Sequence, residues 1–175
     1  GAPMTLLLRS VRKRNDGSWG AREWVMWGIQ TPWSKLVTNP IVAAIIFAGS
    51  LWIFYYTPLF RWAAEDHLGH QWMIIHFLIS GYLFSLSLIG VDPVPKRFPY
   101  PIRLVTLLAT MGFHAFFGVT IMSSTGLLLA DWYGAMGRTW GAPPLEDQIT
   151  GGGIAWGIGE LPTLMLAIIV AVMWS

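Results

Sequence analysis

Four long apolar stretches dominate the pattern of hydrophobic and polar positions in this chain. They run over residues 41–60, 72–91, 104–124 and 154–174, and each is about as long as a helix that crosses a bilayer. The pattern therefore predicts an all-α fold, a polytopic membrane helical bundle with four transmembrane helices. We expect residues 1–40 to form a cytoplasmic or interfacial segment and residues 41–175 to form the four-span membrane domain.

The composition agrees with a membrane protein. The chain is 54% hydrophobic and 11% charged, and its mean hydropathy is +0.54. It has no cysteine, which excludes disulfides, thiolate metal sites and cysteine nucleophiles. Nothing in the sequence resembles a nucleophile paired with a general base for hydrolysis. We therefore expect a protein that is not an enzyme.

The basic residues are distributed unevenly between the two sides of the predicted bundle. Nine of the eleven lie before the first stretch or between the second and third. The positive-inside rule assigns this side to the cytoplasm, so both visible termini are predicted to be cytoplasmic. Segments 61–71 and 125–153 then face outward. Because the positive charge is placed as in a membrane protein, the pI near 9.2 does not point to nucleic acid as a partner.

Three local patterns add detail to this topology. Residues 19–36 mix tryptophans with charges, which is typical of a segment in the headgroup region of the lipid bilayer. Asn39 and Pro40 are a helix start signal for the first span. The run Gly151–Gly153 precedes the fourth stretch, and we expect a flexible loop there with a face for helix packing.

Three of the apolar stretches each contain one ionisable residue, namely His76, His114 and Glu160. Such groups are costly inside a bilayer, which makes each of them a candidate functional residue. At about 1.5 Å per helical residue, they lie roughly 6, 15 and 9 Å below the outer boundary, respectively. The sequence therefore predicts that three helices bring two imidazoles and a carboxylate to one pocket in the outer half of the membrane.

Methionines accompany the two histidines. Met73 precedes His76 by three positions and Met111 precedes His114 by three, so each pair shares a helix face. Thioether and imidazole ligands suit copper, and thioether favours Cu(I). We predict a copper site of His76, His114, Glu160 and these methionines, with His67 and His70 of the outer loop as an entry station.

Other interpretations of the same residues remain open. An intramembrane histidine can simply bond to a neighbouring backbone or hydroxyl group, and methionine in an apolar helix usually only packs. A protonated Glu160 could bond to backbone groups freed by Pro162. His76 and His114 could also ligate haem b in a redox subunit. A third alternative is a non-catalytic accessory subunit of a respiratory complex.

Several separated motifs occur in an order that resembles the CtaG-type cytochrome c oxidase assembly factor family, often fused to a CopD-like copper-resistance domain. The resemblance extends over nearly all of residues 1–175, and its motifs are Tyr55–Phe60, His76–Phe84, Gly90–Pro93, Phe113–Gly118, Gly151–Trp156 and Gly159–Thr163. His76, His114, Glu160, Asp92 and Asp147 fall in the characteristic motifs of the family.

The resemblance implies a multi-pass protein of the bacterial plasma membrane that supplies copper to the haem-copper oxidase. Its partners would be oxidase subunits in the membrane, within the lipid bilayer. Family members generally carry further upstream helices with a His-rich motif of their own, and the opening Gly-Ala-Pro is expected to be the point where such helices end. A CopD-like domain or those upstream helices are therefore further expected partners.

Overall fold

A computed structural model describes residues 2–175, and those residues form helices without any strand. Three helices are long and apolar enough to cross a membrane: α7 (His67–Ile89), α8 (Tyr100–Met122) and α10 (Pro144–Trp174). A bent pair, Pro40–Tyr55 and Pro58–Glu65, makes a fourth span if it is counted as one unit. The prediction of an all-α membrane bundle is therefore confirmed.

The first span is less regular than a single straight helix. It consists of α4 (Pro40–Ala44), the π-helix η1 (Ile45–Gly49) and α5 (Ser50–Tyr55), and α6 (Pro58–Glu65) then turns away by 75°. The apolar stretch continues to residue 60, but the helix ends at Tyr55 because Pro58 cannot continue it. It has no N–H to donate, and its ring pushes the preceding residue out of the helical region. The predicted start is confirmed, since the Asn39 side chain accepts a hydrogen bond from the Ile41 N–H at 3.0 Å.

Helix α7 begins earlier than the second predicted span. The Asp66 carboxylate accepts a hydrogen bond from the Gly69 N–H at 3.0 Å, which satisfies one of the free donors of the first turn. His67 and His70, expected in a loop, therefore lie in the first turn of α7. The helix ends at Ile89, and Gly90 follows with a left-handed φ of +41°.

Helix α10 also begins earlier, at Pro144 rather than near residue 154. The glycine run Gly151–Gly153 is helical, so the predicted flexible loop is wrong at this point. Its role in packing is confirmed, because a Cβ at Gly152 would lie 2.8 Å from Ile121 Cγ2 of α8. Contacts with α8 thus hold these glycines in the helix, although glycine by itself disfavours helix.

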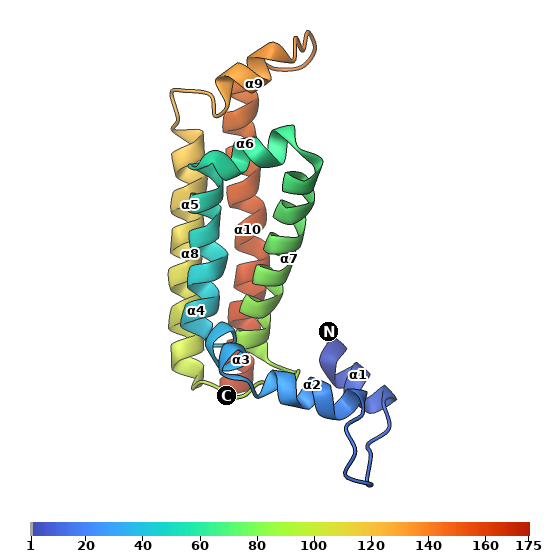
Figure 1. Cartoon of the computed structure of the whole chain (residues 1–175). Coiled ribbons are helices and arrows are strands. Elements are labelled where there is room, and N and C mark those ends of the chain that lie inside the picture. Colours follow the sequence, from blue (N-terminus) through green and yellow to red (C-terminus); the bar gives the residue numbers. More distant parts are fainter. Residues whose placement is uncertain (1) are drawn as a thin grey trace.

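The core joins four elements of the bundle. Five nearly inaccessible side chains from α4, α7, α8 and α10 form it, namely Ala43, Phe84, Leu88, Leu107 and Val170. Phe47 of η1 stacks on Phe84 of α7 with ring centroids 5.3 Å apart. The long helices consequently pack along one another as a bundle (Figure 1).

Short helices cap both ends of the bundle. At the end drawn uppermost in Figure 1, called here the upper end, lie α6 and α9 (Ala130–Ala135). At the opposite, lower end lie α1 (Pro3–Ser10), α2 (Ala21–Ile29), α3 (Pro32–Val37) and the C-terminal residue. Both ends of the described chain are therefore on one side of the bundle, as the four-span prediction requires. Which side faces the cytoplasm stays a prediction.

A buried carboxylate, Asp92, attaches α1 to the lower end of α7. It is 1% exposed. Its oxygens accept hydrogen bonds from the Met4 N–H (3.3 Å), the Thr5 N–H (2.7 Å), the Thr5 hydroxyl (2.8 Å) and the Tyr82 hydroxyl (2.9 Å). Burial acts to raise the pKa of Asp92, but these hydrogen bonds to the charged form outweigh it and lower the pKa.

We expect Asp92→Asn to loosen α1, because an amide oxygen accepts fewer of these hydrogen bonds and the NH₂ group faces donors. The cost should be about 1–3 kcal/mol, seen as faster hydrogen exchange in residues 3–10. Because the pKa is lowered, the stabilisation is present above the ordinary value of 3.8 and is lost as pH falls through the lowered value. Asp16→Asn, in an exposed turn, is the control. Unchanged exchange in Asp92→Asn would contradict the attachment.

Candidate functional site

His76 lies on α7 and has an unusual environment. Its ring stacks on Trp72 one turn earlier, with centroids 5.0 Å apart and planes 16° from parallel, and it meets the edge of Phe77. Its Nε2 is buried and has no hydrogen-bond partner, alone in this among the side-chain nitrogen and oxygen atoms of residues 2–175. The ring borders a cavity of about 500 Å³ lined mainly by α7, with Gln71, Ser80 and Ile46 of η1.

His114 lies on α8 and faces α10. Its ring fills the position that a side chain at Gly159 would occupy, since a Cβ there would lie 2.6 Å from His114 Nδ1 and 2.9 Å from Nε2. No residue larger than glycine fits at position 159 without moving the ring. Because Gly159 has no side chain, the His114 ring can pack directly against the backbone of α10, and this contact sets the position of the ring.

Glu160 follows Gly159 and lies near Pro162, which sits inside α10. Its carbonyl oxygen accepts a hydrogen bond from the Thr163 hydroxyl at 3.0 Å, and the Gly159 carbonyl accepts one from the same hydroxyl at 2.8 Å. The carbonyl that Pro162 leaves without its helical donor is that of Ile158, four residues earlier, so these two bonds do not test the predicted role of the Glu160 carboxyl group. Glu160 itself is half-buried.

The remaining predicted ligands fall on two helices. Four of them follow one another on α7 at steps of three residues, namely His67, His70, Met73 and His76. The first two are exposed and the last two half-buried. Met111 is half-buried on α8, three residues before His114. Side chains three apart on a helix are neighbours, but each step turns by about 60°, so the four α7 residues wind halfway around the helix between the upper end and His76.

The structure does not gather these residues into a complete metal site. Within residues 2–175, no three or more histidine, aspartate or glutamate side chains lie together in a way that could hold a metal ion. His76 borders a cavity beside η1, whereas His114 packs onto α10. The expected meeting of His76, His114 and Glu160 as a three-ligand centre is thus not seen. The assignment of individual residues to copper stays a prediction.

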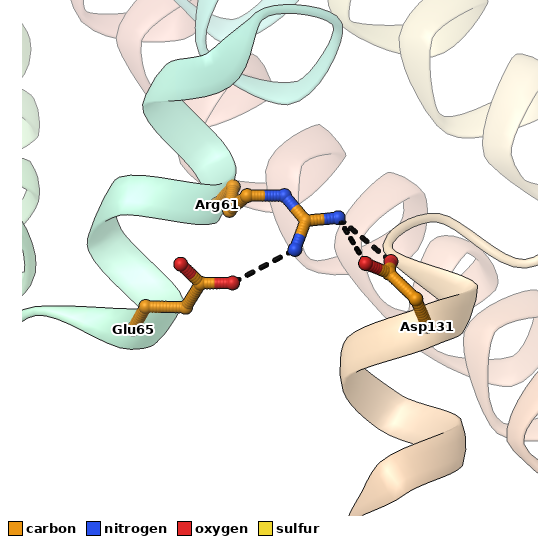
Figure 2. Close-up of polar contacts among 3 residues, drawn as sticks. All are labelled: Arg61, Glu65 and Asp131. Carbon is orange, nitrogen blue, oxygen red and sulfur yellow. Dashed lines mark hydrogen bonds and ion pairs between the residues drawn. The ribbon is translucent and has the colours of Figure 1, made fainter.

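A charged bridge closes the upper end. Arg61 of α6 donates from Nη1 to Glu65 at 2.8 Å and from Nη2 to both carboxylate oxygens of Asp131, at 2.7 and 2.6 Å (Figure 2). These bonds join α6 to α9. The hydrogen bonds from Arg61 are the main cause that lowers the pKa of Asp131. The sequence placed both residues in outward segments, but it gave no sign that they would meet.

Close to this bridge, the structure contains a second cavity that sequence reasoning missed. It has a volume of about 440 Å³ and is lined by residues of α5, α8, α10 and the segment around α9, including Tyr55, Phe117, Leu128, Tyr133 and Gln148. Gln148 fastens that segment, because its side chain accepts from the Leu128 N–H at 2.8 Å and donates to the Gly126 carbonyl at 3.1 Å. The only sign of this cavity in the sequence is the aromatic content of the segment around α9.

We expect Gly159→Ala to destabilise the protein by about 1–3 kcal/mol, because the new methyl group overlaps the His114 ring. Gly157→Ala is the matched control, since nothing lies within 4 Å of a Cβ there and alanine favours helix. Thermal unfolding in detergent, with the NMR shifts of the His114 ring, measures both variants. Equal stability of the two would show that the ring is not held by Gly159.

We expect Asp131→Asn to raise hydrogen exchange in α9, because the bidentate bond to Arg61 loses its charge. Lowering the pH should likewise raise hydrogen exchange in α9 of the wild-type protein. With a lowered pKa, Asp131 keeps the bridge above the ordinary value of 3.8 and loses it as pH falls through the lowered value. Asp147→Asn, whose carboxylate pairs instead with Arg138, is the comparison variant. If the hydrogen-exchange rate in α9 changed neither in Asp131→Asn nor at low pH, the bridge would be refuted.

Comparison of the sequence with known proteins identifies its family. The whole chain, residues 1–175, matches the family model described as cytochrome c oxidase caa3 assembly factor. No solved structure matches the chain.

Two curated relatives are the uncharacterized proteins Mb0105 of Mycobacterium bovis and ML1998 of Mycobacterium leprae. They are 42% and 40% identical to this chain over 176 residues, with 100% of this chain aligned in each case. The matched region is 27% of the length of each relative. With a family model that matches from the first residue to the last, this helical chain belongs to the cytochrome c oxidase caa3 assembly factor family.

Proposed function

We propose that this protein assists maturation of a haem-copper oxidase by handling copper, its cargo, in the outer half of the membrane. Membership of the assembly factor family supports a role in oxidase assembly and favours a non-catalytic one. The copper role rests on one observation in particular, the buried and unpartnered Nε2 of His76.

An unpartnered imidazole nitrogen inside a bilayer calls for a partner. Leaving a buried polar atom unbonded costs about 1–3 kcal/mol, and lipid chains offer it nothing. A metal ion or a polar group from another helix would remove this cost. A neutral imidazole nitrogen with a free lone pair is a normal copper ligand, and the cavity beside it leaves space for an ion and a further ligand.

The series on α7 supplies a route to that nitrogen. His76 lies nine positions after His67, with His70 and Met73 between them, a rise of about 13.5 Å along the helix. Each is one step of three from the next, so copper would pass between neighbouring side chains while it moves halfway around the helix. Imidazoles at the exposed end and a thioether next to His76 suit uptake followed by holding of Cu(I).

The proposal includes an incomplete site, which suits a protein that gives its metal away. Copper held at His76 and Met73 would complete its coordination with groups from outside residues 2–175, including those of the recipient oxidase subunit. His114, Met111 and Glu160 would then contribute only where a partner brings them within reach. The predicted partners are accordingly oxidase subunits in the same plasma membrane.

Titration of the purified full chain with Cu(I), in competition with a chromophoric chelator, tests the proposal. We expect His76→Leu to weaken binding at least about tenfold, or ~1.4 kcal/mol, and Met73→Leu to weaken it several-fold. Met165→Leu is the control, because Met165 is 63% exposed on α10, away from the series. A strain with His76→Leu should accumulate copper-deficient oxidase.

The opposite results are equally specific. A wild-type protein that retains no Cu(I), or His76→Leu with unchanged affinity and full oxidase copper, would refute the site. A Soret band in the purified protein would instead favour the haem-binding alternative.

A further inference from the structure

A cluster of exposed aromatic rings covers part of the lower end. Trp19, Trp24 and Trp27 are 53%, 56% and 56% exposed, yet they pack on one another with centroids 4.7 to 6.5 Å apart. We call them the tryptophan cluster. Three half-exposed indoles are unfavourable in bulk water, and the bilayer interface is where this side chain prefers to lie.

Positive charge lies next to this cluster. Residues 1–40 carry six basic and two acidic side chains. Arg9, Arg12 and Lys13 are exposed, and none of them forms an ion pair with any residue in the described range 2–175. We call these three the basic turn; Arg9 is in the last turn of α1, and Arg12 and Lys13 follow in the segment that leads to α2.

The two acidic residues in this region are already engaged. Glu23 accepts hydrogen bonds from the Gly20 N–H at 3.0 Å and the Arg14 N–H at 3.4 Å, and Asp16 accepts from the Ser18 N–H and hydroxyl at 3.0 and 2.6 Å. Neither forms an ion pair with the basic turn. The surplus positive charge therefore remains available to a partner.

A groove lies between the tryptophan cluster and Arg14, the residue that follows the basic turn in the sequence. It has a volume of about 420 Å³ and is lined by Arg14, Trp19, Met26 and Trp27 and also by Glu23, whose carboxylate already accepts hydrogen bonds from the Gly20 and Arg14 N–H groups. Its apolar side belongs to the tryptophan cluster, and its polar side belongs to the segment that carries the basic turn. Such a groove has room for a headgroup with its phosphate directed to the arginine side.

The surface is also fixed relative to the bundle. Helix α2 extends sideways from the lower end instead of continuing along the long helices (Figure 1). Arg22 of α2 donates to the Leu8 carbonyl of α1, and Thr5 of α1 bonds to Asp92 at the end of α7. These contacts hold the tryptophan cluster at the level of the lower end of the bundle, where α7 ends and α8 begins.

We propose that the tryptophan cluster and the basic turn form a binding surface for anionic phospholipid headgroups of the adjacent leaflet. Indoles would lie at the headgroup level while Arg9, Arg12 and Lys13 pair with lipid phosphates. Each basic residue close to an anionic surface adds attraction that salt screens. This surface is separate from the proposed copper residues of α7, so the two proposals stand or fall independently.

Quenching of tryptophan fluorescence by brominated lipids tests this surface on the full chain in nanodiscs. The wild type should be quenched by brominated phosphatidylglycerol at a several-fold lower mole fraction than by brominated phosphatidylcholine. Arg9→Gln/Arg12→Gln/Lys13→Gln should remove the preference, as should about 1 M salt. Trp19→Phe/Trp24→Phe/Trp27→Phe should lose the anion-selective part of the signal, while Trp140→Phe, on the opposite end, should keep it.

Each result decides the proposal. A preference for the anionic lipid that disappears in the charge variant supports it. Equal quenching by both lipids in the wild type would leave an interfacial aromatic segment without headgroup selectivity and overturn it. A preference that survives in the charge variant would place the anionic lipid elsewhere. Absence of quenching from the tryptophan cluster would mean that the cluster faces protein or water. Circular dichroism of each variant checks that the helices persist.

Discussion

The close approach of α8 and α10 is the constraint on which the rest of the structure depends. Small residues make it possible at several heights, because Gly118 receives Trp156, Gly152 receives Ile121 and Gly159 receives the His114 ring. Lipid gives little hydrophobic drive for helices to associate, so contact between backbones and side chains must supply the affinity. This same contact orients His114. The contact between α8 and α10 therefore both holds the helices together and positions His114, a candidate functional residue.

The two ends of the bundle are organised by different chemistry. At the upper end, the exposed Arg61 bridges α6 and α9, and its pairs are screened by solvent. At the lower end, the buried carboxylate of Asp92 holds α1 by three hydrogen bonds and accepts a fourth from Tyr82 of α7. Between them, α7 carries its histidines and Met73 from the exposed end to the buried nitrogen of His76. The proposed copper route therefore lies on a helix that is held at both ends, by contact of Trp72 with Trp62 of α6 at the upper end and by the Tyr82–Asp92 hydrogen bond at the lower end.

The sequence predicts the all-α bundle and the start of the first span, because apolar length and the Asn39-Pro40 cap are local properties. It fails where tertiary contacts prevail. Gly151–Gly153 looks like a loop by propensity, yet contact with α8 keeps it helical. The depth of His76, His114 and Glu160 follows from counting residues, but rotation about each helix axis does not, so their expected meeting could not be derived. The bridge between Arg61 and Asp131 depends on the 75° turn at Pro58, which the hydropathy pattern treats as one continuous span.

Membership of an oxidase assembly family and a buried, unpartnered histidine nitrogen lead to one central claim, that the protein delivers copper to the oxidase. The most direct measurement is the ratio of copper to haem in oxidase purified from a strain that lacks this protein. The account predicts oxidase that contains its haem but has lost copper, with recovery when the wild-type chain is restored. Oxidase with a full copper content, or with copper present and haem missing, would contradict it.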